Sequence, residues 1–210
     1  NDYANPYERL NAMITVMLGE TETVEVFKPA IQNGEPETVN IKVGTADGHH
    51  SYKVDDKTKG SFLYYDYTVP EDTELFFFYP NRYLRQVKLN VNDKVAGASG
   101  SYTSKGTFGG GESNCIVSLG ESTTGNLYLK VEIDNDSNNL YVIPKDSYIY
   151  YIDMETMRDA FTRLGEKQLL IDSESTDSHI FGTVTTDSEN QLMFTSIPYD
   201  EGWNVYVDGE

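Results

Sequence analysis

An acidic turn in the chain carries oxygen ligands at the spacing of a calcium loop. Asp134, Asp136 and Asn138 alternate, as the first ligands of such a loop do. The sixth position is Asn139 instead of glycine, and the twelfth is Lys145, where a bidentate glutamate is required. A hairpin turn explains the same residues, so we predict that the chain holds no functional metal and no cofactor.

The histidines and the cysteine, which are the other candidate metal ligands and nucleophiles, are scattered along the sequence. His49 and His50 are adjacent, so on a strand their side chains point to opposite faces. His179 and Cys115 stand apart from them, without the spacing of a zinc site or of a Cys/His pair. The 34 acidic residues are too many for a glycosidase-type pair of carboxylates to be singled out. We predict no catalytic residue, and a self-contained hydrolase is the weakest of our alternatives.

The sixteen tyrosines suit another chemistry, the binding of sugars. Aromatic rings contact the apolar faces of pyranose rings, but the same side chains also fill cores and cover sheets. We favour packing over a sugar platform for most of them. The aromatic candidates are Tyr64, Tyr65, Tyr67, Tyr148, Tyr150, Tyr151 and Trp203.

The composition limits the partners. The formal net charge is −18, from 34 acidic and 16 basic residues, and such a field repels nucleic acid and anionic lipid headgroups. No run of residues is long and apolar enough to cross a bilayer, and the first residues lack the features of a signal peptide. Cys115 is the single cysteine, so no disulfide forms within the chain. The polar, tyrosine-rich composition indicates an exposed β protein.

The first segment has the signals of a helix. Asn5 suits the N-cap, Pro6 the first helical position and Gly19 the position after the last turn. From there to Pro144 the hydrophobic period is two, which predicts a series of short strands. The run Leu75–Tyr79 is apolar on both faces and predicts a central strand deep in the core.

A second helix is predicted between Asp153 as its cap and Gly165 as its end. Its apolar residues fall on one face, which we expect to lie on a sheet. Four further strands are expected after it. The apolar residues of the helix are Met154, Met157, Phe161 and Leu164, and the four strands are Gln168–Ile171, Ile180–Thr185, Gln191–Ile197 and Trp203–Val207.

Together these elements predict a mainly β fold, an antiparallel β-sandwich of jelly-roll type with one or two short helices. We divide the chain into a helical segment at residues 1–20, a main β-sandwich at 21–152, and a helix with strands at 153–210. The last part either completes the sandwich or forms a small second β unit.

The C-terminal residues carry the most specific motif of the chain. The run from Ser196 to Gly209 reads S-I-P-Y-D-E-G-W-N-V-Y-V-D-G and resembles the S-x-P-Y-D-x-G-W-x-x-Y-V-D-G motif of YfhO-like bacterial membrane proteins. Three more blocks resemble that family in the same order. They are Asn5-Pro6-Tyr7-Glu8 leading to Asn11, Leu89–Lys94, and the helix Met154–Leu164 followed by Ile180-Phe181-Gly182.

The resemblance implies a domain on the extracytoplasmic face of the cell membrane, within a multi-spanning protein similar to GT-C glycosyltransferases. Such proteins of Gram-positive bacteria are linked to glycosylation of lipoteichoic or teichoic acid from lipid-linked sugars. Their acidic catalytic residues are expected in the membrane part, so none is carried over to this sequence. The implied partners are the membrane-embedded part of the same polypeptide and a cell-surface glycan or glycolipid, and no cofactor is implied.

Within the motif, Tyr199, Asp200 and Trp203 are the candidate binding residues. A structural role explains the motif as well, with turns at its proline and glycines and Trp203 as an anchoring aromatic. We therefore predict a non-catalytic accessory domain, and the alternative is an independent carbohydrate-binding β-sandwich module. The family pattern continues beyond Glu210 through further strands to a membrane span, so Trp203–Val207 is expected to be an edge strand.

Overall fold

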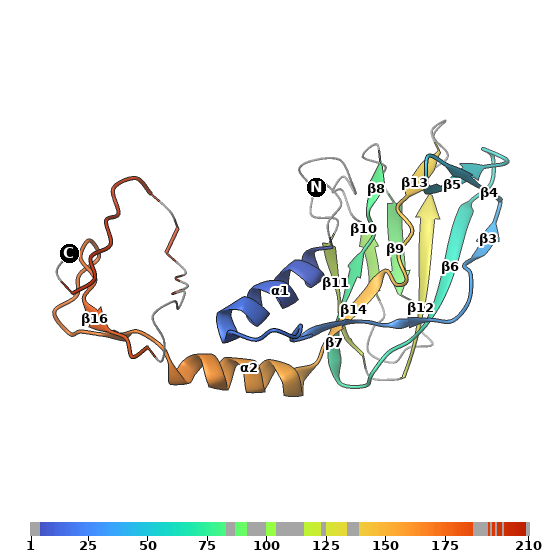
Figure 1. The fold of residues 1–210 in the computed structure, drawn as a ribbon. Coiled ribbons are helices and arrows are strands. Elements are labelled where there is room, and N and C mark those ends of the chain that lie inside the picture. The colour runs from blue at the N-terminus through green and yellow to red at the C-terminus, as the bar shows by residue number, and fades with distance from the viewer. Residues whose placement is uncertain are drawn as a thin grey trace.

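The computed structural model describes residues 5–82, 87–91, 100–103, 116–122, 125–133, 139–186, 193, 195, 197–198 and 200–208. Antiparallel strands stack into a β-sandwich, and two helices lie beside one of its ends (Figure 1). The prediction of a mainly β, antiparallel sandwich with short helices is therefore confirmed.

Three sheets make up the sandwich. One has the order β10-β9-β12-β6-β2, with β3 also paired to β6; the second has the order β1-β14-β7-β11, and the third β4-β5-β13-β8. Every pairing in them is antiparallel. The strands are β1 Phe27–Pro29, β2 Ile31–Gln32, β3 Glu37–Val39, β4 Ile41–Ala46, β5 His49–Val54, β6 Ser61–Thr68, β7 Thr73–Phe78, β8 Asn81–Arg82, β9 Val87–Val91, β10 Gly100–Thr103, β11 Ile116–Ser122, β12 Asn126–Ile133, β13 Leu140–Val142 and β14 Ile149–Ile152.

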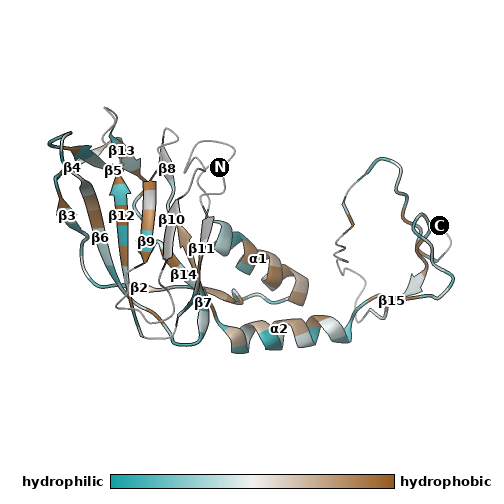
Figure 2. Cartoon of the chain, turned by 180° about the vertical axis from the view of Figure 1, so that it is seen from behind, coloured by the Kyte–Doolittle hydropathy of each residue, from teal (hydrophilic) through white to brown (hydrophobic). Residues whose placement is uncertain are grey.

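Alternation along the strands builds the core. In β12 hydrophobic and hydrophilic residues follow one another (Figure 2), and Leu127, Leu129, Val131 and Ile133 are all buried. In β6, which pairs with β12 along its whole length, the buried positions are held by Ser61, Leu63, Tyr65 and Tyr67. Side chains on the other face of β6 point outward and are more exposed.

The apolar run after Thr73 forms the central strand that the sequence predicts. Strand β7 lies between β14 and β11, and Leu75, Phe77 and Phe78 are buried. Phe77 stacks on Tyr79, with ring centroids 5.0 Å apart. Phe76, on the opposite face, meets the ring of Tyr7 at 5.9 Å. The strand is apolar on both faces because the core covers one side and a helix covers the other.

That helix, α1, spans Pro6–Leu18 and has the predicted caps. The side chain of Asn5 accepts a hydrogen bond from the Tyr7 amide, and Gly19 ends the helix at φ 70°. Glycine suits this left-handed C-cap because it has no Cβ to clash. The apolar face packs through Tyr7 and Ile14, which are both buried.

The second helix, α2, spans Met154–Glu166 and does not lie on a sheet face, so that prediction is wrong. Met157 and the buried Ala160 pack against a small cluster with Ile14 and Val26, between α1 and the end of β14. Phe161 is 57% exposed, because the second half of α2 extends away from the sandwich (Figure 1). The helix also runs through Gly165, one residue past the predicted end.

The start of α2 joins it to β1. Asp153 caps the helix by accepting from the amides of Glu155 and Thr156, and its second oxygen pairs with the Lys28 ammonium at 2.5 Å. The hydrogen bond from Lys28 is the main reason that the pKa of Asp153 is lowered, and the Thr156 amide adds to it. The pKa of Lys28 is raised, chiefly by the same bond.

We expect Asp153→Ala to lower the free energy of unfolding by about 1–2 kcal/mol at neutral pH, the usual cost of a lost N-cap and one partly exposed ion pair. A lowered pKa in the folded state stabilises the fold above the unfolded value, near 3.9, and that contribution is lost as pH falls through the folded value. The difference between wild type and variant, measured by urea unfolding, should thus shrink below about pH 4. Asp153→Asn keeps the cap and should lose less; an equal loss would assign the effect to the ion pair alone.

The strands expected after α2 form only in part. β15 Leu170–Ile171 pairs with β16 Gly182–Thr183, and these two strands make a sheet of their own. Trp203–Val207 is not a strand, which corrects the prediction of an edge strand there, and most of Gln191–Ile197 lies outside the described residues. Val205, Tyr206 and Val207 are each more than two-thirds exposed. Alternation alone does not make a strand, since its backbone groups also need a partner strand.

Candidate functional site

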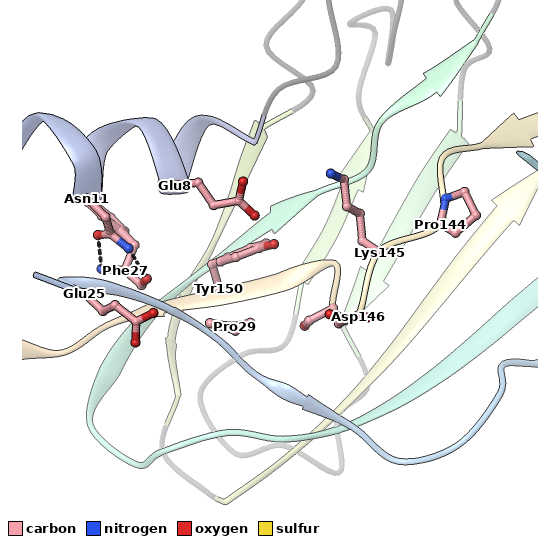
Figure 3. A pocket seen from close by; sticks show the side chains of 10 residues that line it. Glu8, Asn11, Glu25, Phe27, Pro29, Pro144, Lys145, Asp146 and Tyr150 are labelled. Atoms are coloured by element: carbon pink, nitrogen blue, oxygen red, sulfur yellow. Dashed lines mark hydrogen bonds between the residues drawn. The ribbon is translucent and has the colours of Figure 1, made fainter. Parts of the chain in front are cut away.

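A pocket of about 320 Å³ opens where α1, β1 and β14 meet (Figure 3). The helix contributes Glu8 and Asn11, and β1 contributes Phe27 and Pro29. Glu25 precedes β1, and the loop 144–147 leads into β14 and its Tyr150. The walls thus come from the start and the end of the sandwich sequence, which meet because β1 pairs with β14.

Tyr150 forms the aromatic floor of the pocket. It is 5% exposed, and its ring stacks on that of Tyr7 with the centroids 4.6 Å apart. Its hydroxyl accepts a hydrogen bond from the Asn5 amide at 2.6 Å. Burial raises the pKa of Tyr150 to about 12 against the opposing effect of that bond, and the charges of Glu8 and Asp146 add to the rise. The hydroxyl therefore stays protonated at neutral pH and is able to donate.

The rim of the pocket is charged. Glu8, Glu25 and Asp146 are exposed, and Lys145 is half-buried. In Figure 3 the side chains of Glu8, Lys145 and Asp146 lie around the hydroxyl end of Tyr150. One oxygen of Glu8 accepts from the Asn5 amide at 3.0 Å, so the carboxylate is oriented by the same residue as the tyrosine. An aromatic floor with polar groups around it is the usual composition of a small-molecule site.

Asn11 lines the pocket, but its side chain is already engaged in hydrogen bonds that stabilise the fold. Its amide nitrogen donates to the Phe27 carbonyl at 2.8 Å, and its oxygen accepts from the Phe27 amide at 2.9 Å (Figure 3). The side chain thereby acts as an extra strand partner for β1 and ties α1 to the sheet. We assign Asn11 to the construction of the pocket wall.

Asp200 and Trp203, two of the residues predicted from the C-terminal motif, do not line this pocket. Tyr199 lies outside the described residues. Asp200 and Trp203 stand in a turn: Asp200 accepts from the Gly202 amide at 2.8 Å and, through its carbonyl, from the Trp203 amide at 3.1 Å. Trp203 is 40% exposed. This geometry fits the predicted turn, and a binding role for these three residues stays a prediction.

The aromatic candidates divide between the two faces of their strands. Tyr65, Tyr67 and Tyr148 are buried in the core, where the hydroxyls of Tyr65 and Tyr79 lie 2.8 Å apart. Tyr64 points outward from β6 beside Phe62. Packing thus explains most of the tyrosines, as predicted.

Phe62 and Tyr64, the outward aromatic pair on β6, already have a lysine of the same chain beside them. The Lys130 ammonium sits 3.8 Å above the centre of the Phe62 ring, and 6.0 Å from that of Tyr64. A cation held against a ring leaves that face unable to stack on a sugar. We take the pocket at Tyr150 as the candidate site because it is concave and polar groups surround its aromatic base.

The remaining sequence candidates form no second site in the described part of the chain. His49 contacts the carbonyl of Asp47 at 2.7 Å, and His179 stacks loosely on Phe181. Cys115 and the acidic turn at 134–138 lie outside the described residues. Among the residues that the structure covers, no three histidine, cysteine or acidic side chains are grouped so as to hold a metal ion.

Sequence reasoning missed the charged rim. Glu8 and Asn11 were noted only as part of a family block, and Lys145 only as a failed calcium ligand. The sequence signal for this rim is that charged and amide residues are frequent beside the predicted strand ends. Nothing in the order of residues reveals that Glu8 and Asp146 share a pocket.

A family profile described as bacterial membrane protein YfhO matches residues 1–210, the whole chain. The chain belongs to the YfhO family. No curated protein matches this YfhO chain. No helix of the described residues has the length and hydropathy that crossing a membrane requires.

Solved structures similar to this YfhO domain include several carbohydrate-binding modules. A family 29 module from Piromyces equi has a TM-score of 0.34 and 9% identity over 60% of this chain and 88% of its own. A family 35 module from Clostridium thermocellum has a TM-score of 0.33 and 17% identity, over 58% and 95%. A xylan-binding module, CBM86, from Roseburia intestinalis has a TM-score of 0.34 and 10% identity, over 62% and 98%.

Proposed function

We propose that this chain is a non-catalytic accessory domain of a YfhO membrane protein, and that it binds a glycan in the pocket at Tyr150. The observation that carries the proposal is the composition of the pocket. A protonated tyrosine hydroxyl and an aromatic surface lie at its base, with carboxylates and an ammonium around them. Sugars need both elements, since they present apolar C–H faces and many hydroxyl groups.

The volume also fits this ligand class. Small-molecule sites in proteins have roughly 300–1,000 Å³, and the pocket, with about 320 Å³, stands at the lower end of that range. We infer that it accommodates one or two sugar residues of a chain. The groups around Tyr150 bind and orient such a residue, and we assign none of them to catalysis.

For the parent protein we propose a place on the extracytoplasmic face of the cell membrane and a role in the transfer of lipid-linked sugars to a lipoteichoic or teichoic acid. In this proposal the domain contacts the membrane-embedded part of the same polypeptide and holds a cell-surface glycan or glycolipid. The family profile supports the membrane setting. Comparing glycosylated wall polymers in cells with and without the domain tests the role.

We retain the division of the chain as a proposal, with residues 1–20 as a helical segment and 21–152 as the main sandwich. Residues 153–210 are proposed as a small second unit, which the separate pairing of β15 with β16 supports. Tyr199, Asp200 and Trp203 are proposed as a second contact for the same ligand. The stand-alone carbohydrate-binding module stays the alternative, and binding of glycans by the domain without its membrane part would favour it.

We expect Tyr150→Phe to weaken glycan binding about five-fold, because one hydrogen bond contributes about 1 kcal/mol. The ring and its stacking on Tyr7 remain, so the fold should be retained. The measurement is a titration of amide chemical shifts with a panel of oligosaccharides.

Tyr64→Phe is the matched control, since it removes a hydroxyl from the outward face of β6 and leaves the pocket intact. Shift changes that cluster on β6 and respond to Tyr64→Phe would move the site to that sheet face. The absence of any shift change with the whole panel would refute the proposed glycan binding.

A further inference from the structure

The charges on the pocket rim are unbalanced. Three carboxylates, those of Glu8, Glu25 and Asp146, face one ammonium, that of Lys145. They come from different elements, the first turn of α1, the segment before β1 and the loop before β14. Figure 3 shows them spread around the opening. The rim therefore surrounds the ligand with negative charge from several directions.

The rest of the molecule adds to the same field. The chain has a formal net charge of −18, so an anionic ligand is repelled on approach and a cationic one is attracted. The field reaches the floor of the pocket, because Glu8 and Asp146 both contribute to the raised pKa of Tyr150. Phosphate groups and uronic acid residues are thus disfavoured inside this pocket.

Acidity is combined here with an aromatic surface. The base of the pocket consists of half-buried Phe27 together with the small exposed part of Tyr150, whose ring is otherwise buried against Tyr7, and the carboxylates are exposed at its edge. A bare metal ion would not need an aromatic surface in its site. An organic cation contacts both parts of this pocket, with its apolar body against the rings and its charge beside the carboxylates of the rim.

We propose that the pocket takes an amino sugar with a free ammonium group, the sugar ring lying against Phe27 and the exposed edge of Tyr150, and the ammonium beside the carboxylates of Glu8 and Asp146. This inference rests on the proposed glycan binding and specifies its ligand class. The Tyr150 hydroxyl donates a hydrogen bond to a hydroxyl group of the bound amino sugar. An N-acetylated sugar has the same ring but no charge, so it should bind less tightly.

The experiment compares two probes of equal length, a tetramer of β-1,4-linked glucosamine and the fully N-acetylated tetramer, by calorimetry and amide shift titration. We expect the amine form to bind about ten-fold more tightly at pH 6 and low salt, as two or three partly exposed ion pairs together provide. Raising the salt from about 0.02 M to 0.5 M should remove most of this preference, because exposed charges are screened.

Glu8→Gln and Asp146→Asn are each expected to reduce the affinity for the amine form about three-fold and to leave the N-acetylated form unaffected. Both changes keep size and an acceptor oxygen, so Glu8→Gln preserves the bond from Asn5. Glu71→Gln is the matched control, since it removes one exposed charge that does not line the pocket. This control should leave the affinity for the amine tetramer and that for the N-acetylated tetramer nearly unchanged.

Equal binding of the two tetramers would overturn the amino sugar inference and leave the proposed glycan binding standing. If neither tetramer binds and the oligosaccharide panel also fails, the proposed function itself is wrong. An equal loss of amine binding in Glu71→Gln would show that the net charge of the chain, and not the pocket, attracts the probe. Displacement of the amine form by millimolar calcium with a shift of Glu8 and Asp146 would reassign the rim to a metal ion.

Discussion

Phe77→Ala is expected to reduce the free energy of unfolding by about 3–5 kcal/mol, the range for a fully buried phenylalanine. The ring has no exposed surface, and it lies in the central strand β7 against Tyr79. Removing it leaves a cavity between the sheets that their paired strands cannot close. Urea unfolding followed by tyrosine fluorescence measures the change.

The matched control for this variant is Phe161→Ala, since that ring is 57% exposed on α2. The control should cost less than about 0.5 kcal/mol, as surface substitutions do. A loss of less than 1 kcal/mol for Phe77→Ala, or a loss of several for Phe161→Ala, would contradict the core described here. The second outcome would also restore the prediction that this face of α2 is covered.

Asn11→Ala is expected to lower the free energy of unfolding by about 2–4 kcal/mol. The side chain is buried and makes two hydrogen bonds to the backbone of Phe27. Alanine leaves the amide and the carbonyl of Phe27 without these partners, and a buried polar group without a partner costs about 1–3 kcal/mol. Thermal unfolding measures the loss, and proteolysis of α1 under native conditions detects its detachment.

Asn11→Asp provides the comparison for this position. Its carboxylate keeps an acceptor for the Phe27 amide but can no longer donate to the Phe27 carbonyl. We expect a loss at least as large as that of alanine at neutral pH, and a partial recovery once acid protonates the carboxyl group. Unchanged stability in both variants would mean that α1 is held by Tyr7 and Ile14 alone.

Local sequence signals predicted the sandwich because they describe local physics. The helix caps at Asn5, Gly19 and Asp153 are present, since each satisfies backbone groups within its own turn. The strand Leu75–Tyr79 is central because its two apolar faces each need a cover.

The signals failed where the outcome depended on a distant partner. The apolar stripe of α2 marks one face, but it does not say whether a sheet, another helix or no element covers it. In the structure the apolar contact with α1 is made by Met157 and Ala160 of the first half. The alternation at Trp203–Val207 likewise predicted a strand, and no partner strand is present in the described chain to accept its hydrogen bonds.

The pocket was beyond prediction for the same reason. Tyr150 was one of seven aromatic candidates, and its place on a pocket floor depends on the pairing of β14 with β1 across more than a hundred residues. The carboxylates of Glu8 and Asp146 are two of 34 acidic groups. Their proximity follows from the strand topology, which cannot be inferred from the composition.

The contact between Asn5 and Tyr150 joins residues 145 apart in the sequence, so during synthesis it forms only after most of the domain has been made. Ribosomes add roughly 5–20 residues each second, so α1 waits on the order of ten seconds for the ring against which it packs. Until then its apolar face and the backbone of β1, which pairs with β14, stay open to other chains. Non-local pairing of this kind also slows closure after synthesis. The last strand of the sandwich, β14, lies between β1 and β7 and carries Tyr150, so a nascent chain stalled before residue 149 would lack both this link in the sheet and the floor of the pocket.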